Sequence, residues 1–119
     1  MEMPRFALLL HDSPRGWHCD FFLEVGDVLK TWALPALPEP GVEMECDALA
    51  DHRLLYLDYE GPISGDRGSV TRWDSGTYTT DRIDRTWVVK LVGTKLCGRV
   101  TLCKSPESTE KWMFCWEGS

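Results

Sequence analysis

Short runs of alternating apolar and polar residues dominate this sequence, and turn-forming residues end each run after a few positions. Residues 5–10, 19–25 and 28–34 are predicted strands, and Gly26-Asp27 supplies a tight turn between the last two. Alternation with a period of two puts the apolar side chains on one face of a strand. No segment carries the sustained 3.6-residue period of an amphipathic helix. The pattern therefore predicts β-structure, with a hairpin over residues 19–34.

The rest of the chain continues in the same manner. Residues 46–51 fit either a short strand or a single helical turn, and Asp74-Ser75-Gly76 predicts the turn of a second hairpin between 69–73 and 77–80. Further strands are expected at 53–58, 87–91, 98–103 and 111–116, with loops at 35–41, 61–68 and 104–110. Because closure removes exposed edges, about eight short strands predict an all-β fold: a single domain, residues 1–119, forming a closed or nearly closed β-barrel.

Composition narrows the classes of function. The 119 residues include 13 Lys plus Arg and 19 Asp plus Glu, which gives a formal charge of −6 and a pI near 5.0. A broad cationic surface for coating nucleic acid is thereby excluded, so any contact with nucleic acid is expected to be small and local. The first ten residues contain too short an apolar run for a signal peptide or a membrane span. We therefore expect a cytoplasmic monomer without membrane contact.

The cysteines fit neither a disulfide framework nor a zinc knuckle, because their number is odd and none forms a CxxC pair. We expect all five to be reduced and structural. They are Cys19, Cys46, Cys97, Cys103 and Cys115.

Two of the three histidines lie close together, with a carboxylate beside them. His18 and Asp20 are two residues apart on an expected strand, so their side chains share a face. His11 ends the preceding strand and can reach that face through a loop over residues 12–17. Two imidazoles and one carboxylate in the mouth of the barrel would form a metal triad with open positions for water and substrate. The alternative is a hydrogen-bonded His–Asp pair on a polar face, with His52 an ordinary histidine at the surface or core edge.

A longer set of motifs resembles, in the same order, the 3′-phosphoesterase domain of bacterial DNA ligase D. The similarity spans nearly the whole chain. Its parts are residues 6–11, Trp17-His18-Cys19-Asp20-Phe21-Phe22-Leu23-Glu24, residues 28–35, Asp51-His52, residues 56–61, Arg72-Trp73-Asp74-Ser75-Gly76-Thr77-Tyr78, and the closing segments 87–91, 95–102 and 111–114.

This resemblance implies a compact β-barrel that uses a divalent metal to trim the 3′ ends of DNA or of DNA–RNA junctions. The implied metal is Mn²⁺, with Zn²⁺ or Co²⁺ as alternatives. The family removes a 3′-terminal ribonucleotide by phosphodiester cleavage and then the remaining 3′-phosphate. By resemblance, His11, His18 and Asp20 are the metal ligands, and His52 and Tyr56 are the catalytic residues that approach the scissile phosphate. The tryptophans at 32, 73, 87 and 112 match structural positions of the barrel.

At three positions the sequence departs from the family pattern, and at each of them a basic residue is missing. Phe22, Ala36 and Met44 stand where the family carries basic residues. Removing one charged contact to phosphate typically lowers a rate by about two to three decades, so three losses together put turnover in question.

Other side chains are candidates for restoring contact with nucleic acid. For the arginines the alternative is ordinary surface charge, and for the tryptophan, which would stack on an unpaired base, it is a role in capping the core. These candidates are Arg15, Arg53, Arg67, Arg72 and Trp17.

The leading hypothesis is a metal-dependent 3′-end-processing phosphoesterase in DNA repair, acting alongside a separate ligase or polymerase. The alternative is a catalytically weakened metal-binding barrel that binds a nucleic-acid end or a protein partner. A third hypothesis is a small-molecule-binding barrel, which would contain no stoichiometric metal. The sequence leaves open which metal is used and whether the substrate is DNA or RNA.

Overall fold

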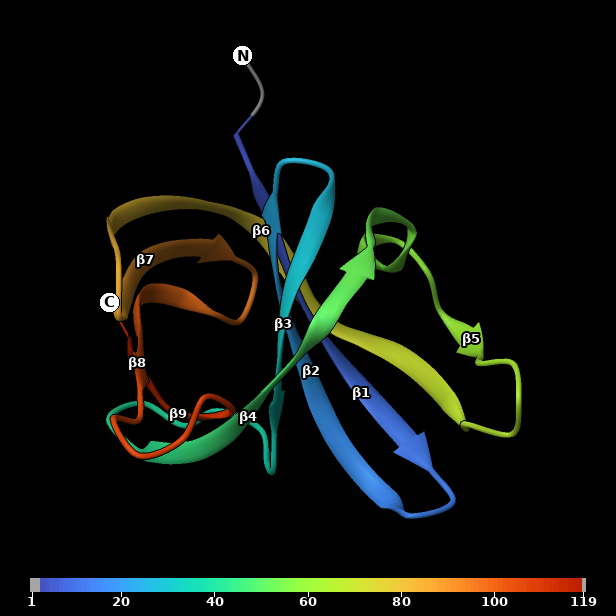
Figure 1. Ribbon diagram of the computed structural model, residues 1–119. Coiled ribbons are helices and arrows are strands. Elements are labelled where there is room, and N and C mark those ends of the chain that lie inside the picture. The colour runs from blue at the N-terminus through green and yellow to red at the C-terminus, as the bar shows by residue number, and fades with distance from the viewer. Residues whose placement is uncertain (1–2, 119) are drawn as a thin grey trace.

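The computed structural model describes residues 3–118 and shows an all-β chain (Figure 1). Residues 1, 2 and 119 of the predicted domain lie outside the described part. None of the helical segments in the described part has the length and apolar character needed to cross a membrane. The elements are β1 (Arg5–Ser13), β2 (Gly16–Val25), β3 (Val28–Leu34), β4 (Glu43–Arg53), the 3₁₀-helix η1 (Leu54–Leu57), β5 (Gly61–Pro62), β6 (Ser69–Ile83), β7 (Thr86–Gly93), β8 (Cys97–Lys104) and β9 (Lys111–Gly118).

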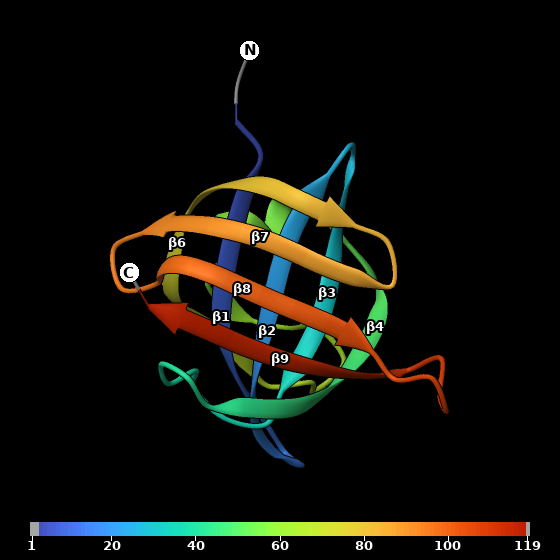
Figure 2. The same ribbon diagram turned by 90° about the vertical axis from the view of Figure 1, so that its left-hand side faces the viewer.

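The strands form one antiparallel sheet that closes on itself. Neighbours follow the order β1-β2-β3-β4-β9-β8-β7-β6, and β6 pairs back to β1. Within residues 3–118, eight strands thus form a barrel-like ring, and the short β5 adds to β6 outside it. In Figure 2, β7, β8 and β9 cross the direction of β1, β2 and β3. The predicted all-β class, with about eight strands in a closed or nearly closed arrangement, is confirmed.

Two apolar clusters lie on opposite sides of the ring wall. The inner core includes Phe6, Leu8 and Phe21, whereas Leu9 and Phe22 belong to a second cluster on the outer wall. The outer cluster is covered by η1 and by the segment that follows it. Residues of β1 and β2 therefore face apolar surroundings on both sides, which explains why these strands contain almost unbroken apolar runs.

The tryptophans predicted to be structural pack into or against the inner core. Trp32 is 3% exposed, and its ring meets those of Trp87 and Trp112 edge-on, at centroid distances of 5.5 and 5.6 Å. Trp73 packs against the same core. Edge-to-face contacts of this kind add to the stabilisation that comes from burial alone.

The segment before the outer cluster differs from its sequence prediction. Residues 46–51 belong to the strand β4, so the strand alternative is correct there. Residues 53–58, expected to form a strand, instead contain η1. The turn folds Leu54, Tyr56 and Leu57 onto the outer wall, where Leu57 is 3% exposed. An extended strand would spread these side chains over its two faces, so burial of the leucines outweighs their strand-like pattern.

The predicted hairpin around Asp74-Ser75-Gly76 is also absent from the described structure, because β6 runs through it without a turn. The buried carboxylate of Asp74 accepts hydrogen bonds from the backbone N–H groups of Thr94, Lys95 and Leu96, at 3.1, 2.9 and 2.7 Å. A Cβ at Gly76 would collide with the backbone of β7. The two turn-forming residues thus serve contacts with distant strands.

All five cysteines are free thiols. Cys19 and Cys46 are buried, and burial raises the pKa of the Cys19 thiol to about 11 and that of Cys46 to about 12. The prediction that all five are reduced agrees with this; Cys103 is exposed, so the burial from which a structural role was expected is absent at that position.

Candidate metal centre

The β1–β2 hairpin brings two of the predicted ligands face to face. Pro14 and Arg15 form its turn, and the pairing of the two strands places His11 directly opposite His18. The ring centroids of the two imidazoles are 4.7 Å apart. The loop expected over residues 12–17 is therefore wrong, because the strands remain paired almost to the turn. That pairing brings His11 to the site, and no swinging loop is needed.

Asp20 completes the triad from β2. Its carboxylate is nearly buried, with Oδ1 2.9 Å from Nε2 of His18 and Oδ2 3.3 Å from Nδ1 of His11. One potential ligand atom from each of the three residues lies within 4.8 Å of the others. Two ligands of the same divalent ion lie at most about 4.4 Å apart, given bonds of about 2.0–2.2 Å. The triad thus needs only a small adjustment of its side chains to bind one ion.

Hydrogen bonds orient the two imidazoles. Nε2 of His11 lies 2.7 Å from the carbonyl oxygen of Arg67. Because a carbonyl only accepts, Nε2 of His11 carries a proton, and Nδ1 is the nitrogen of this ring that could bind a metal. The hydrogen bond to Asp20 raises the pKa of His18, an effect that burial partly offsets. Two imidazole nitrogens and one carboxylate oxygen are a donor set that suits first-row divalent cations.

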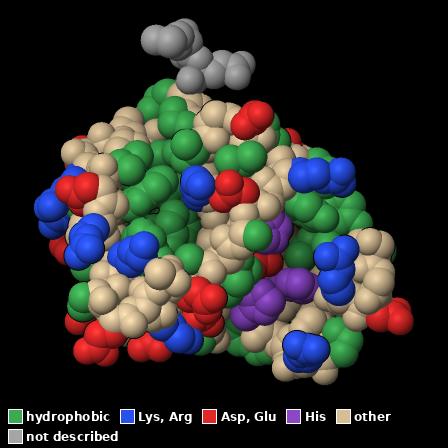
Figure 3. All heavy atoms as spheres, in the orientation of Figure 1, with side chains coloured by type: hydrophobic (Ala, Val, Ile, Leu, Met, Phe, Trp, Pro, Cys, Tyr) green, Lys and Arg blue, Asp and Glu red, His purple; other side chains and the backbone are tan. Residues whose placement is uncertain are grey.

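The triad lies on the outer wall of the ring, so the prediction of a site in the mouth of the barrel is wrong. Leu8 faces the inner core and Leu9 the outer cluster, and His11 continues the outer row of β1. Asp20 lies in the same outer row of β2 as Phe22. Figure 3 shows histidine side chains at the surface beside an acidic side chain, with basic side chains nearby.

His52 lies on the same wall, close to Phe22. The ring of His52 is 5.3 Å from that of Phe22, which follows Asp20 by two residues along β2. Residues two apart on a strand are separated by about 7 Å, so His52 sits about one row of side chains from the carboxylate of Asp20. Tyr56, on η1, packs edge-on against His52 at 5.8 Å. The structure therefore brings both predicted catalytic residues to the face that carries the triad.

The ring of His52 is held in one tautomer. Its Nδ1 lies 2.9 Å from the carbonyl oxygen of Ala50 and 3.0 Å from the hydroxyl oxygen of Thr31. The Thr31 hydroxyl donates its own proton to the carbonyl of Leu29 at 3.0 Å. Both neighbours of Nδ1 thus act as acceptors, so Nδ1 carries the proton in the neutral ring. Nε2 is the nitrogen left to accept or donate a proton.

Two of the four candidate arginines lie beside the triad. Arg15 and Arg67 line a cavity of about 470 Å³ together with His11, between the tip of the β1–β2 hairpin and the loop before β6. The loop is locked against the hairpin at Gly68, whose φ is 88° and where a Cβ would collide with the backbone of β1.

The other two arginines are placed differently. Arg72 lies on β6 and is engaged within the protein, with Nη1 3.4 Å from the carbonyl oxygen of Leu57 and Nη2 3.9 Å from a carboxylate oxygen of Glu60. Arg53 is exposed just before η1. Neither lines the cavity next to His11.

Trp17 is on the opposite side of the hairpin from the triad. It pairs with Asp12 near the end of the hairpin and is 54% exposed. Its side chain lines a second cavity, of about 460 Å³, with Leu10 and Leu37. Alternation along β2 puts Trp17 and His18 on different faces, so Trp17 does not lie against the triad.

Sequence reasoning missed the polar residues that support or border the site. The sequence alone does not indicate that Thr31 contacts His52, because this contact depends on the pairing of β3 with β4. Glu45, Asp47 and Lys111 line a cavity of about 280 Å³ that also includes His18. The charged residues at 45 and 47 alternate along one strand, which was the only available signal that they share a face.

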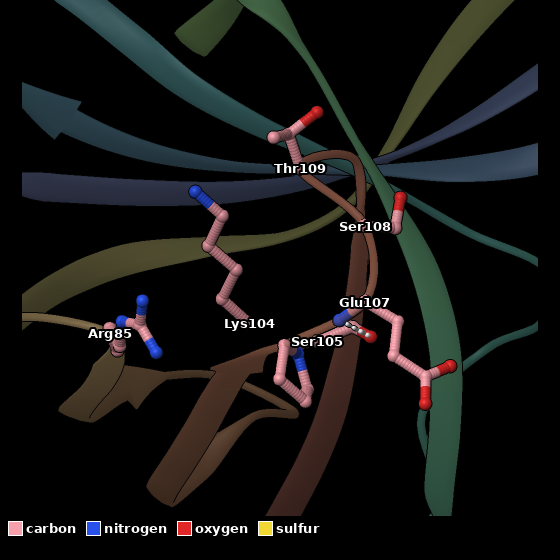
Figure 4. A pocket seen from close by; sticks show the side chains of 7 residues that line it. Arg85, Lys104, Ser105, Glu107, Ser108 and Thr109 are labelled. Atoms are coloured by element: carbon pink, nitrogen blue, oxygen red, sulfur yellow. Dashed lines mark hydrogen bonds between the residues drawn. The ribbon is translucent and has the colours of Figure 1, made fainter.

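A further cavity, of about 220 Å³, lies between the β6–β7 turn and the β8–β9 connection. Figure 4 shows Arg85 and Lys104 on one side of it and the hydroxyls of Ser108 and Thr109 on the other. The backbone N–H of Glu107 donates to a serine hydroxyl in the same loop at 3.2 Å. No histidine or cysteine lines this cavity among the described residues, so it does not repeat the chemistry of the triad.

Comparison with known proteins assigns the chain to a family. The model of the DNA Ligase D 3′-phosphoesterase domain matches residues 10–104, a span that contains the triad, His52 and Tyr56.

Similar proteins are the multifunctional non-homologous end joining protein LigD of Pseudomonas aeruginosa, 36% identical over 112 residues, and the multifunctional non-homologous end joining DNA repair protein LigD of Mycobacterium tuberculosis, 36% identical over 118 residues. The alignments cover 85% and 91% of this chain but only 13% and 15% of those relatives. On the family match and this level of identity, the chain belongs to the DNA ligase D 3′-phosphoesterase domain family.

Proposed function

We propose that this chain is a divalent-metal-dependent phosphoesterase that processes the 3′ ends of DNA during non-homologous end joining. Its reactions would be removal of a 3′-terminal ribonucleotide and then of the remaining 3′-phosphate. The observation that carries the proposal is the convergence of His11, His18 and Asp20 within 4.8 Å, with His52 and Tyr56 on the same wall. The names of the similar proteins support the place in end joining.

The triad would hold the cation, with Mn²⁺ as first choice and Zn²⁺ or Co²⁺ as alternatives. When bound, a divalent cation supplies positive charge that offsets the charge of the phosphate and favours attack by water. The carbonyl of Arg67 keeps the proton of His11 on Nε2, away from the cation. Because Asp20 is nearly buried, its carboxylate would attract a bound cation more strongly than an exposed carboxylate would.

His52 would act on the phosphate through Nε2. Because Ala50 and Thr31 hold the proton on Nδ1, only Nε2 changes its protonation state. In the protonated ring, Nε2–H donates to a non-bridging phosphate oxygen as negative charge develops there. Tyr56 packs edge-on against this ring, and its hydroxyl would be a second donor to the phosphate.

The test uses a primer–template with a 3′-phosphate, incubated with purified protein and Mn²⁺. We expect conversion to a 3′-hydroxyl, lowered by about two to three decades in His52→Ala. In Asp20→Asn, both conversion and Mn²⁺ affinity, measured by titration, should fall, with affinity lower by about 100-fold or more. Asp51→Asn, an exposed carboxylate paired with Lys30, is the matched control and should leave both unchanged. Full activity of Asp20→Asn would contradict the proposal.

A second candidate function is metal-dependent binding of a nucleic-acid end, or of a protein partner such as a separate ligase or polymerase, without turnover. This function is retained because no basic residue stands at any of the three positions where the family carries a cation. Phe22 is 1% exposed in the outer cluster, Met44 packs against the inner core, and Ala36 is exposed. Stoichiometric Mn²⁺ binding with no conversion at high protein concentration would select this function over the first.

A further inference from the structure

The triad lies between two cavities of opposite charge. The cavity next to His11 is lined by Arg15 and Arg67 against one acid, Asp66. The cavity next to His18 is lined by two acids and one base. The protein as a whole is acidic, so this concentration of arginines next to the triad is a local reversal of charge.

On the His11 side, donors remain available to a ligand. Arg67 uses Nε and Nη2 to bond Ser64, at 2.7 Å to the carbonyl oxygen and 3.2 Å to the hydroxyl. These bonds hold the side chain in place and leave its remaining N–H groups to donate elsewhere. Arg15 is exposed, and its guanidinium has no hydrogen bond or ion pair with any other residue in the described part of the chain.

On the His18 side, the one base is already neutralised. Nζ of Lys111 lies 2.6 Å from a carboxylate oxygen of Asp47 and 3.9 Å from one of Glu45. An incoming phosphate would meet two carboxylates and a cation that is already paired. The two carboxylates would repel the negatively charged phosphates, so the side next to His18 disfavours a phosphate backbone.

We propose that the phosphate backbone of the substrate strand enters the site over the cavity next to His11, with Arg15 and Arg67 as its phosphate-binding residues. This inference rests on the proposed function and specifies the direction from which its substrate arrives. A volume of about 470 Å³ is in the range of pockets that hold small organic ligands, so the cavity has room for a phosphate group and part of its sugar. Guanidinium groups suit this task because they donate two parallel hydrogen bonds to phosphate oxygens.

The experiment measures binding of a fluorescent 3′-phosphate oligonucleotide by anisotropy, in the presence of Mn²⁺ and over a series of salt concentrations. Arg15→Ala and Arg67→Ala should each weaken binding by about tenfold or more. Each should also make the plot of log binding constant against log salt concentration less steep. The slope should change by about 0.7, the value for one phosphate contact on a single strand.

Lys111→Ala is the matched control, because it removes a cation from the cavity on the other side of the triad. Because it also frees the carboxylates of Asp47 and Glu45, it should weaken binding of the oligonucleotide slightly, and by less than either arginine variant. A larger loss in Lys111→Ala than in the two arginine variants would overturn the proposal. Unchanged binding in both arginine variants would do so as well.

Metal titration separates a lost phosphate contact from a damaged triad. Because the Arg67 carbonyl that holds His11 is backbone, Arg67→Ala and the second variant Arg67→Gln should keep the Mn²⁺ affinity of the unmodified protein. If the Arg67 variants bind the oligonucleotide more weakly only because they have lost affinity for Mn²⁺, Arg67 does not contact the phosphate directly. Oligonucleotide binding without conversion, still sensitive to the two arginines, would reject the catalytic proposal and support this one. No binding by the unmodified protein would reject this inference.

Discussion

Replacing Phe22 by arginine would restore the cation that the family resemblance places there, but the structure predicts a large loss of stability. Phe22 is 1% exposed and packs in the outer cluster, with its ring 5.3 Å from that of His52. Truncating a buried phenylalanine to alanine costs about 3–5 kcal/mol. An arginine covers part of the vacated surface with its aliphatic stem while its charged end seeks water. We therefore expect Phe22→Arg to lower the free energy of unfolding by about 2–4 kcal/mol.

Urea denaturation followed by tryptophan fluorescence measures this loss. Phe22→Leu is the matched control, because it keeps an apolar side chain in the cluster and should cost no more than about 1.5 kcal/mol. If Phe22→Arg unfolds within about 1 kcal/mol of the unmodified protein, smaller than the range of typical core effects, Phe22 does not serve the packing of the wall. The argument that packing has replaced charge at this position then fails.

Two further predictions concern carboxylates. Asp74→Ala removes the acceptor of three backbone N–H groups in the β7–β8 turn and should lower the free energy of unfolding by about 3 kcal/mol or more. Asp84→Ala, at an exposed turn, is the control and should leave the urea midpoint close to that of the unmodified protein. Equal urea midpoints for the two variants would contradict this. In the metal-free protein, an NMR titration should give His18 a pKa above 6.5. The pKa of His18 should be lower in Asp20→Asn, which weakens the hydrogen bond that raises it. Because the folded pKa is the higher one, the stabilisation from this pair is complete below about pH 6.5 and disappears as pH rises through the folded pKa; a value at or below 6.5 would refute the pairing.

The fold class followed from the sequence because period-two alternation is a local signal, and closure is the general way to protect the edges of many short strands. The errors came from residues that serve distant contacts. Asp74 and Gly76 have turn chemistry, yet one binds the β7–β8 turn and the other permits close approach of β7. Single-sequence patterns contain no information about such partners, so the turn chemistry of these residues wrongly predicts a hairpin within the long strand β6.

The candidate site was predictable to the extent that it depends on local spacing. The spacing of His18 and Asp20 correctly placed them on one face. The position of His11 depends on the register of the β1–β2 hairpin, which the turn of the hairpin fixes. Whether the triad lies on the outer wall or in the interior depends on which row of apolar side chains the ring of strands encloses. The support of His52 by Thr31 needed the pairing of β3 with β4. These are properties of the assembled sheet.

The wall that separates the two apolar clusters is a single layer of strands, and neighbouring residues of β1 and β2 project to opposite sides of it. The candidate metal ligands and the residues of the inner core consequently alternate along the same strands. Side chains such as Leu8 and Phe21 can be exchanged for others of equal volume without touching the face that carries the triad. The outward row is divided along its length: Ala7, Leu9 and Phe22 are buried in the outer cluster, whereas His11 and His18 are partly exposed, so substitutions at the two histidines can change the charge of the surface without entering either apolar cluster.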